Sequence, residues 1–113
     1  MNLQAETVNG VLVVTTSENR IDAAIAIQFK DKMRELTEFC PDRIVLDLSS
    51  VDFLDSSGLG AVVAAMKQLS SGKTLELAGL TNTVNKVFRL TRMDSVFTIH
   101  ASAALAIGQA HAS

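Results

Sequence analysis

The sequence predicts an α/β fold: a single domain in which a mostly parallel central sheet of about four to five strands is packed by about four helices. Short β-branched or apolar runs alternate with longer segments in which apolar residues recur every three or four positions. The 113 residues suit one domain, and no linker, repeat or low-complexity tract divides them. Apolar residues make up 48% of the chain and charged residues 19%, which is typical of a globular domain. Residues 1–113 are therefore expected to form one unit.

The N-terminal part predicts a hairpin. Residues 2–8 are a short mixed segment that is expected to form an edge strand, and the β-branched run Val11–Thr16 is expected to pair with it. Asn9 and Gly10 separate the two runs, and this dipeptide is a strong hairpin signal because both residues tolerate positive φ. Residues 17–20 are expected to form a loop.

A first helix is expected from about Ala23 to Phe39. Asp22 can cap its N-terminus, and Pro41 stops it because proline cannot continue a helix. Spacings of three or four residues give the helix one apolar face. The residues of this face are Ile25, Phe29, Met33, Leu36 and Cys40.

The middle of the chain predicts a buried strand, a loop and a second helix. The run Ile44–Leu48 is almost wholly apolar and reads as a central strand covered on both faces. A loop over Ser49–Asp55 follows, with a small hydrophobic insert at Phe53 and Leu54. The second helix is expected from about Ser56 to Ser71, with Gly72 as its C-terminal stop. Its inner face is expected to be Leu59, Val62, Val63, Met66 and Leu69.

The last third of the chain repeats the alternation. Thr74–Ala78 reads as a strand, Asn82–Arg92 as a third helix, Val96–Ile99 as a short strand and Ala101–Ala110 as a terminal helix. Within the third helix, the positions expected to face inward are Val84, Val87, Phe88 and Thr91.

Composition argues against several classes of function. The net charge is −2 and the cations are scattered among acids, so neither nucleic acid nor an anionic membrane surface is an expected partner. The longest nearly uninterrupted apolar run, 59–66, is far short of the roughly 20 residues of a membrane helix. No signal peptide is recognisable at the N-terminus, so a cytoplasmic location is expected. Cys40 is the single cysteine, and an internal disulfide is therefore impossible.

Sites for metals, cofactors and catalysis are not expected. His100 and His111 are isolated, with no cysteine or third histidine to complete a metal site. No phosphate-binding Gly-x-x-x-x-Gly-Lys motif is present. A Ser-His-Asp hydrolase would place its serine between glycines, whereas the serine pair of this chain precedes them. Asp47, in the buried strand, is expected to accept a backbone hydrogen bond. Glu76 is expected to lie on the far side from Ser57, so that Glu76→Ala changes partner binding little.

Residues 43–60 carry the strongest functional signal. A buried strand leads into an acidic, hydroxyl-rich turn that opens a helix, and ligands of open α/β sheets bind beyond the carboxyl ends of strands. Asp55 or Ser56 can cap the helix, which places Ser57 in its first turn. Gly58 and Gly60 leave little bulk there, so the backbone of a partner could approach closely. Taken alone, such a run is most often only a helix cap.

The run VDFLDSSGLGAVVAAMKQL at residues 51–69 resembles the STAS domain, which sulfate transporters and bacterial anti-sigma-factor antagonists share. The segments RIDAAIAIQFKDKM and NTVNKVFRLTRMDSVFTIHASAALAI support the resemblance, which covers nearly the whole chain. The resemblance implies a non-enzymatic switch protein without a cofactor, phosphorylated on Ser57. It implies a partner-binding face made of Asp22, Asp55, Ser56, Ser57, Gly58, Leu59 and Gly60.

The implied partner is an anti-sigma factor that is also a serine kinase with a histidine-kinase-like ATPase fold. In this family the unphosphorylated serine form binds the kinase and so frees a sigma factor, and a serine phosphatase resets the switch. The chain departs from the family at Ser17–Ile21, where the usual glycine before Asp22 is missing. Two alternatives stay open: a cytoplasmic STAS subunit of a phospholipid ABC transporter, and a STAS switch with another output such as biofilm formation.

Overall fold

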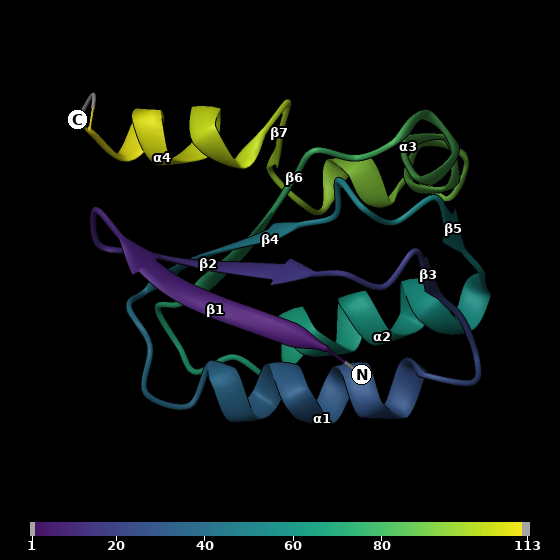
Figure 1. The fold of residues 1–113 in the computed structure, drawn as a ribbon, viewed down its shortest axis with the longest axis horizontal. Helices are drawn as coiled ribbons and strands as arrows, with labels where there is room; N and C mark the ends of the chain where they lie inside the picture. Colours follow the sequence, from purple (N-terminus) through teal and green to yellow (C-terminus); the bar gives the residue numbers. More distant parts are fainter. Residues whose placement is uncertain (1, 112–113) are drawn as a thin grey trace.

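A five-stranded sheet forms the centre of the protein, whose computed structural model describes residues 2–111 (Figure 1). The strand order is β1-β2-β4-β6-β7; β1 is antiparallel to β2, and the other neighbours are parallel. The strands are β1 (Leu3–Val8), β2 (Val11–Thr16), β4 (Arg43–Asp47), β6 (Thr74–Ala78) and β7 (Ile99–His100). A separate two-stranded parallel sheet pairs β3 (Arg20–Ile21) with β5 (Phe53–Leu54). The predicted fold class is confirmed.

Four α-helices and one 3₁₀ turn connect the strands. They are α1 (Ala26–Leu36), α2 (Ser56–Lys67), α3 (Asn82–Leu90), the 3₁₀ turn η1 (Met93–Ser95) and α4 (Ala103–His111). Figure 1 shows α1 and α2 side by side on one face of the central sheet and α4 on the other. None of the helices in the described range is long and apolar enough to cross a membrane.

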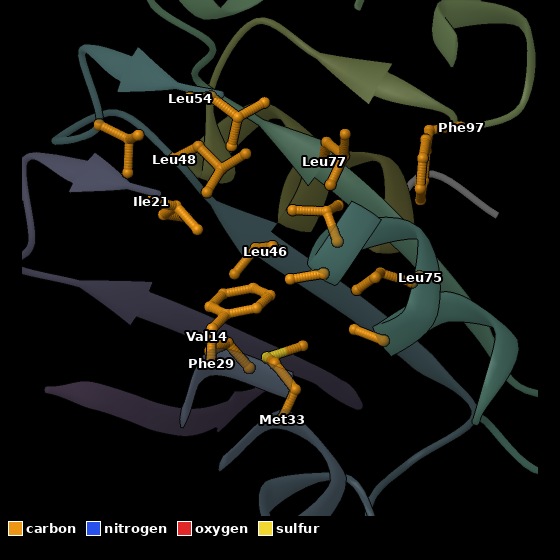
Figure 2. Packing of buried hydrophobic residues seen from close by; sticks show 14 of the residues in the cluster. Val14, Ile21, Phe29, Met33, Leu46, Leu48, Leu54, Leu75, Leu77 and Phe97 are labelled. Carbon is orange, nitrogen blue, oxygen red and sulfur yellow. The ribbon is translucent and has the colours of Figure 1, made fainter. Parts of the chain in front are cut away.

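Two separate apolar clusters hold the layers together. The larger one lies between the sheet, α1, α2 and α3, and its fully buried members include Phe29, Leu46 and Leu77 (Figure 2). The smaller cluster lies under α4 and contains Val13, Val45 and Ala106 among others. Strand β4 runs between the two clusters, with Ile44, Val45 and Leu46 all 0% exposed. A central strand buried on both faces is therefore confirmed.

The hairpin prediction is also confirmed. Asn9 and Gly10 both have positive φ, 54° and 79°, and they join β1 to β2. These angles suit the right-handed twist of the two flanking strands, which is why an Asn-Gly pair is favoured at this position.

The first helix is shorter than the sequence predicts. It begins at Ala26 instead of Ala23, because Asp22 caps a preceding turn: its Oδ1 accepts from the Ala24 amide at 3.0 Å, and its carbonyl accepts from Ile25 at 3.1 Å. It ends at Leu36, where the hydroxyl of the buried Thr37 donates to the Met33 carbonyl at 2.7 Å and closes the last turn.

Other boundaries also move, and each has a local cause. Arg20, which was expected in a loop, forms β3 together with Ile21, because the two residues pair with the hydrophobic insert at Phe53 and Leu54. The last strand is 99–100 instead of 96–99, because the turn continues past η1: the amides of Val96 and Phe97 both donate to the Met93 carbonyl. The Phe97 ring packs edge-on against that of Phe88, with the ring centres 5.9 Å apart.

Helix faces follow the predicted periodicity with corrections. Phe29, Met33, Val62, Val84 and Phe88 are buried as expected, and other predicted members pack on the cluster from half-buried positions. One expectation is wrong, because Thr91 lies outside α3 and is exposed. In α2, small residues are buried in addition to Val62 of the predicted face. These small buried residues are Gly58, Ala61 and Ala65.

Candidate functional site

Asp55 organises the turn that opens α2. It is the N-cap residue in extended backbone conformation, and its Oδ1 accepts the Gly58 amide at 2.8 Å. Its Oδ2 accepts the Ala23 amide at 3.2 Å, from the turn that precedes α1. One carboxylate therefore satisfies a free amide of the first helical turn and ties together two segments that lie far apart in the sequence.

Removing this carboxylate is expected to loosen the site and destabilise the fold. Asp55→Ala should lower the free energy of unfolding by about 1–2 kcal/mol, the usual loss for an N-cap side chain. The matched control is Asp52→Ala, an exposed aspartate on the same loop, which should change stability by less than about 0.5 kcal/mol. Urea unfolding of both variants measures the difference. Equal losses would contradict the assignment of the cap to Asp55.

Contacts within the protein itself leave no room for a side chain at Gly58. The residue is buried, and a Cβ built on it would overlap the carbonyl oxygen of Ile21 in β3 and lie 3.1 Å from Leu54 Cδ1. The expectation that Gly58 leaves room for a partner is therefore wrong, because its space is already occupied by the protein. Gly60 differs, since a Cβ there would meet nothing within 4 Å.

Ser57 lies at the second position of α2, on the outside of the molecule. Its side chain is exposed, as is that of Ser56, whereas Leu59 is half-buried and packs on the larger apolar cluster. Ser57 also lines a shallow groove of about 190 Å³ between α1 and α2. The other residues lining this groove are Ala26, Ile27, Lys30, Gly60, Ala61 and Ala64.

The Asp22 turn lies next to the Ser57 turn, because Ala23 donates to Asp55. Asp22 is half-buried and pairs with Arg20, Nε to Oδ2, at 2.9 Å. The Arg20 guanidinium stacks 4.7 Å from the centre of the Phe53 ring, which is 41% exposed. Asp22 and Asp55 are therefore brought together as the sequence predicts. Arg20 and Phe53 were not among the predicted site residues, although the apolar insert in a polar loop could have indicated this segment.

A second polar cluster lies under α4. Arg43 binds Glu76 with two hydrogen bonds of 2.6 and 2.8 Å, His100 Nε2 lies 2.6 Å from Glu76 Oε1, and Arg43 also donates to the Ala106 carbonyl at 3.0 Å. Burial raises the pKa of Glu76, but hydrogen bonds from Arg43 and His100 and their charges outweigh it and hold that pKa below its ordinary value. The hydrogen bond to Glu76 raises the pKa of Arg43. Replacement of Glu76 is therefore expected to destabilise the fold, because its carboxylate holds side chains from both neighbouring strands.

Neither cluster has the donors of a metal site. No group of three His, Cys, Asp or Glu side chains in the described part of the chain is arranged to hold an ion. The side chain of His111 lies outside the described residues. Asp47 accepts the Ser49 amide at 2.9 Å, the backbone role expected of it.

The chain matches a known domain family over nearly its whole length. A model of the STAS domain matches residues 2–106. The chain belongs to the STAS domain family. A relative from Bordetella bronchiseptica that carries the name anti-sigma factor antagonist BtrV is 28% identical over 100 residues, which are 88% of this chain and 85% of the relative.

Solved STAS structures share the whole fold. An anti-sigma factor antagonist from Mycobacterium paratuberculosis superposes with a TM-score of 0.85 at 24% identity, over 97% of this chain and 93% of that one. SpoIIAA in its unphosphorylated form superposes with a TM-score of 0.77 at 22% identity, over 99% and 98% of the two chains. The Bacillus SpoIIAA in its phosphorylated form gives 0.69 at 22% identity, over 96% and 98%.

Proposed function

We propose that this STAS protein is an anti-sigma factor antagonist that changes partners when Ser57 is phosphorylated. In the unphosphorylated state it binds an anti-sigma factor that is also a serine kinase, and this binding frees a sigma factor in the cytoplasm. A serine phosphatase restores the binding form. The observation that carries the proposal is the exposed Ser57 hydroxyl on the first turn of α2, between the Asp55 cap and an open groove.

The geometry supports phosphorylation without unfolding. Ser57 is exposed and belongs to no buried contact, so a phosphate can be added without moving the core. The positive end of the helix dipole favours an anion at this position. The Asp55 cap leaves the hydroxyl of Ser57 uninvolved in holding the turn.

The same modification would act as an off-switch. A phosphate adds about −1.5 to −2 charges to the surface. Asp55 caps the turn, and the Asp22 turn lies next to it through the hydrogen bond from Ala23 to Asp55. A partner that buries this face would have to desolvate the added charge. The names of the relatives support the same reading, since BtrV is named as an anti-sigma factor antagonist and SpoIIAA is known in unphosphorylated and phosphorylated forms.

Paired baits test the proposal. Wild-type protein should capture a small ATPase-like serine kinase from the lysate of its host, and Ser57→Asp should bind the purified kinase at least about tenfold more weakly, or about 1.4 kcal/mol. Ser57→Ala should still bind the kinase but should not accept phosphate from it. The matched control is Ser56→Ala, which should accept phosphate normally.

Two results would overturn the proposal. Phosphate transfer to Ser57→Ala at the wild-type rate would show that another residue is the acceptor. Capture of a transport ATPase by both wild type and Ser57→Asp would show that the face docks on a transporter and that Ser57 is only a contact residue.

A further inference from the structure

The groove between α1 and α2 has the size and lining of a socket for one side chain. Its volume is about 190 Å³, below the roughly 300–1,000 Å³ of pockets that hold drug-sized ligands. Ala26, Gly60, Ala61 and Ala64 line it with methyl groups and bare backbone. Ile27 stands at its rim with 70% of its side chain exposed. An apolar side chain from another protein fits such a hollow better than a polar one.

Lys30 gives the same groove a positive charge, which favours a partner with a negative charge. The neighbouring cations of α1 are both paired: Lys32 with Glu35 at 3.5 Å, and Arg34 with Asp31 at 3.6 Å. Among the side chains that the structure describes, no carboxylate lies within ion-pair distance of the Lys30 ammonium. The groove therefore offers one uncompensated positive charge beside an apolar hollow.

The walls of the groove are held in place from within. The side-chain amide of Gln68 in the turn after α2 donates to the Lys30 carbonyl at 3.1 Å, which ties the two helices together at one end. At the other end Asp55 joins the turn before α1 to the first turn of α2. A partner would therefore meet a preformed groove, which reduces the entropy lost on binding.

We propose that this groove receives an aliphatic side chain of the partner while a neighbouring glutamate or aspartate of the same partner segment pairs with Lys30. The inference rests on the proposed function and specifies the chemistry of the partner that it requires. It also gives phosphorylation a second effect. A phosphate on Ser57 would narrow the groove and would compete with the carboxylate of the partner for Lys30.

Site-specific photocrosslinking in host cells tests the groove even while the partner is unidentified. Benzoylphenylalanine replaces Ile27 at the groove rim, Phe53 beside the Asp22 turn, or Phe39 as a control that is 94% exposed beyond the other end of α1. The Ile27 position should give an adduct whose mapped peptide contains an aliphatic residue next to an acidic one, and the Phe39 position should give none. An Ile27 adduct to a basic or aromatic segment, or to a second copy of this chain, overturns the proposal.

The crosslinking results distinguish the proposal for the groove from the proposed phosphorylation switch. Adducts at Phe53 that disappear in the Ser57→Asp background, with none at Ile27, would overturn the groove and leave the proposed function standing. Adducts at Ile27 that persist in the Ser57→Asp background would contradict the switch and leave the groove standing. No adduct at Ile27 or Phe53 would overturn both.

Once the crosslinked partner has been purified, its affinity for charge-reversal variants of this protein gives an independent test. Lys30→Glu should weaken binding about tenfold, and Lys30→Arg should retain most of the affinity. Gly60→Leu should weaken binding similarly by filling the groove, since Gly60 lines it and a Cβ there would meet nothing within 4 Å. The matched control Lys86→Glu, exposed on α3, should leave the affinity within about twofold. Equal losses from Lys30→Glu and Lys86→Glu would overturn the pairing, because they would reflect net charge alone.

Discussion

Gly58→Ala is expected to lower the free energy of unfolding by about 3 kcal/mol, at the upper end of the usual effect of overpacking. The added methyl group would overlap the Ile21 carbonyl oxygen and lie 2.8 Å from the carbonyl carbon. Backbone atoms cannot rotate away as a flexible side chain can, and Ile21 is fixed by pairing with Leu54 in the small sheet. Helix α2 would have to move away from β3, and the hydrogen bond from Gly58 to Asp55 would stretch.

Gly60→Ala is the matched control, two residues further along the same helix. A Cβ there meets nothing within 4 Å, so only the helix propensity changes, and alanine should raise stability by about 0.5–1 kcal/mol. Urea unfolding of both variants is the measurement. A neutral Gly58→Ala would show that α2 is not packed against the Ile21 carbonyl.

The same pair of variants connects stability with function. The displacement of α2 in Gly58→Ala would shift the Ser57 turn relative to the Asp22 turn, because Asp55 holds both. Binding of the kinase should therefore fall in Gly58→Ala even at temperatures where the variant remains folded. Gly60→Ala should bind nearly as wild type, since a single methyl group fills little of the groove.

The order of helices and strands could be predicted from the chain because each signal is local. Asn9 and Gly10 specify their turn, and Ile44–Leu48 is too apolar for any position but the centre of the sheet. The pairing of β3 with β5 could not be predicted in this way. It joins two residues to two others that lie far along the chain, and neither dipeptide has a periodic pattern of its own.

In the candidate site, too, the local features could be predicted from the sequence and the long-range contacts could not. The local turn sequence predicted a helix cap at Asp55 or Ser56 and placed Ser57 in the first turn; the structure assigns the cap to Asp55 and leaves Ser57 exposed. The reason for Gly58 could not be predicted, because a sequence shows that a glycine tolerates a close approach but not which atoms approach. The groove beside Ser57 also depends on packing, since small residues of two helices line it.

Glu76 shows how an alternating strand can mislead. In the run Thr74–Ala78 the glutamate alternates with leucines, a pattern that is typical of a strand with one face in water. The face opposite the leucines is instead covered by α4, and Glu76 meets Arg43 and His100 from the two neighbouring strands there. Because Arg43 also donates to the Ala106 carbonyl, the cluster fastens α4 to the sheet.

Glu76→Ala is therefore expected to lower the free energy of unfolding by about 3 kcal/mol, the lower end of the range for breaking a buried ion pair. The glutamate side chain is 12% exposed and that of His100 only 5%, so water cannot replace the lost partner fully. Glu76→Gln keeps the shape and one acceptor and should lose less. The control is Glu6→Gln on β1, an exposed position that should change stability by less than about 0.5 kcal/mol.

The dependence of stability on pH distinguishes the charge of Glu76 from its packing. Because the pKa of Glu76 is lowered in the folded protein, the unfolded chain binds a proton at this residue more readily. The contribution of the charge is therefore fully present above the ordinary carboxyl pKa of about 4.3 and is lost as the pH falls through the lower folded value. The stability of wild type should fall more steeply than that of Glu76→Gln between about pH 5 and pH 2 in urea titrations. Parallel curves would show that the carboxylate contributes through its shape alone, and that the Arg43 and His100 contacts do not depend on its charge.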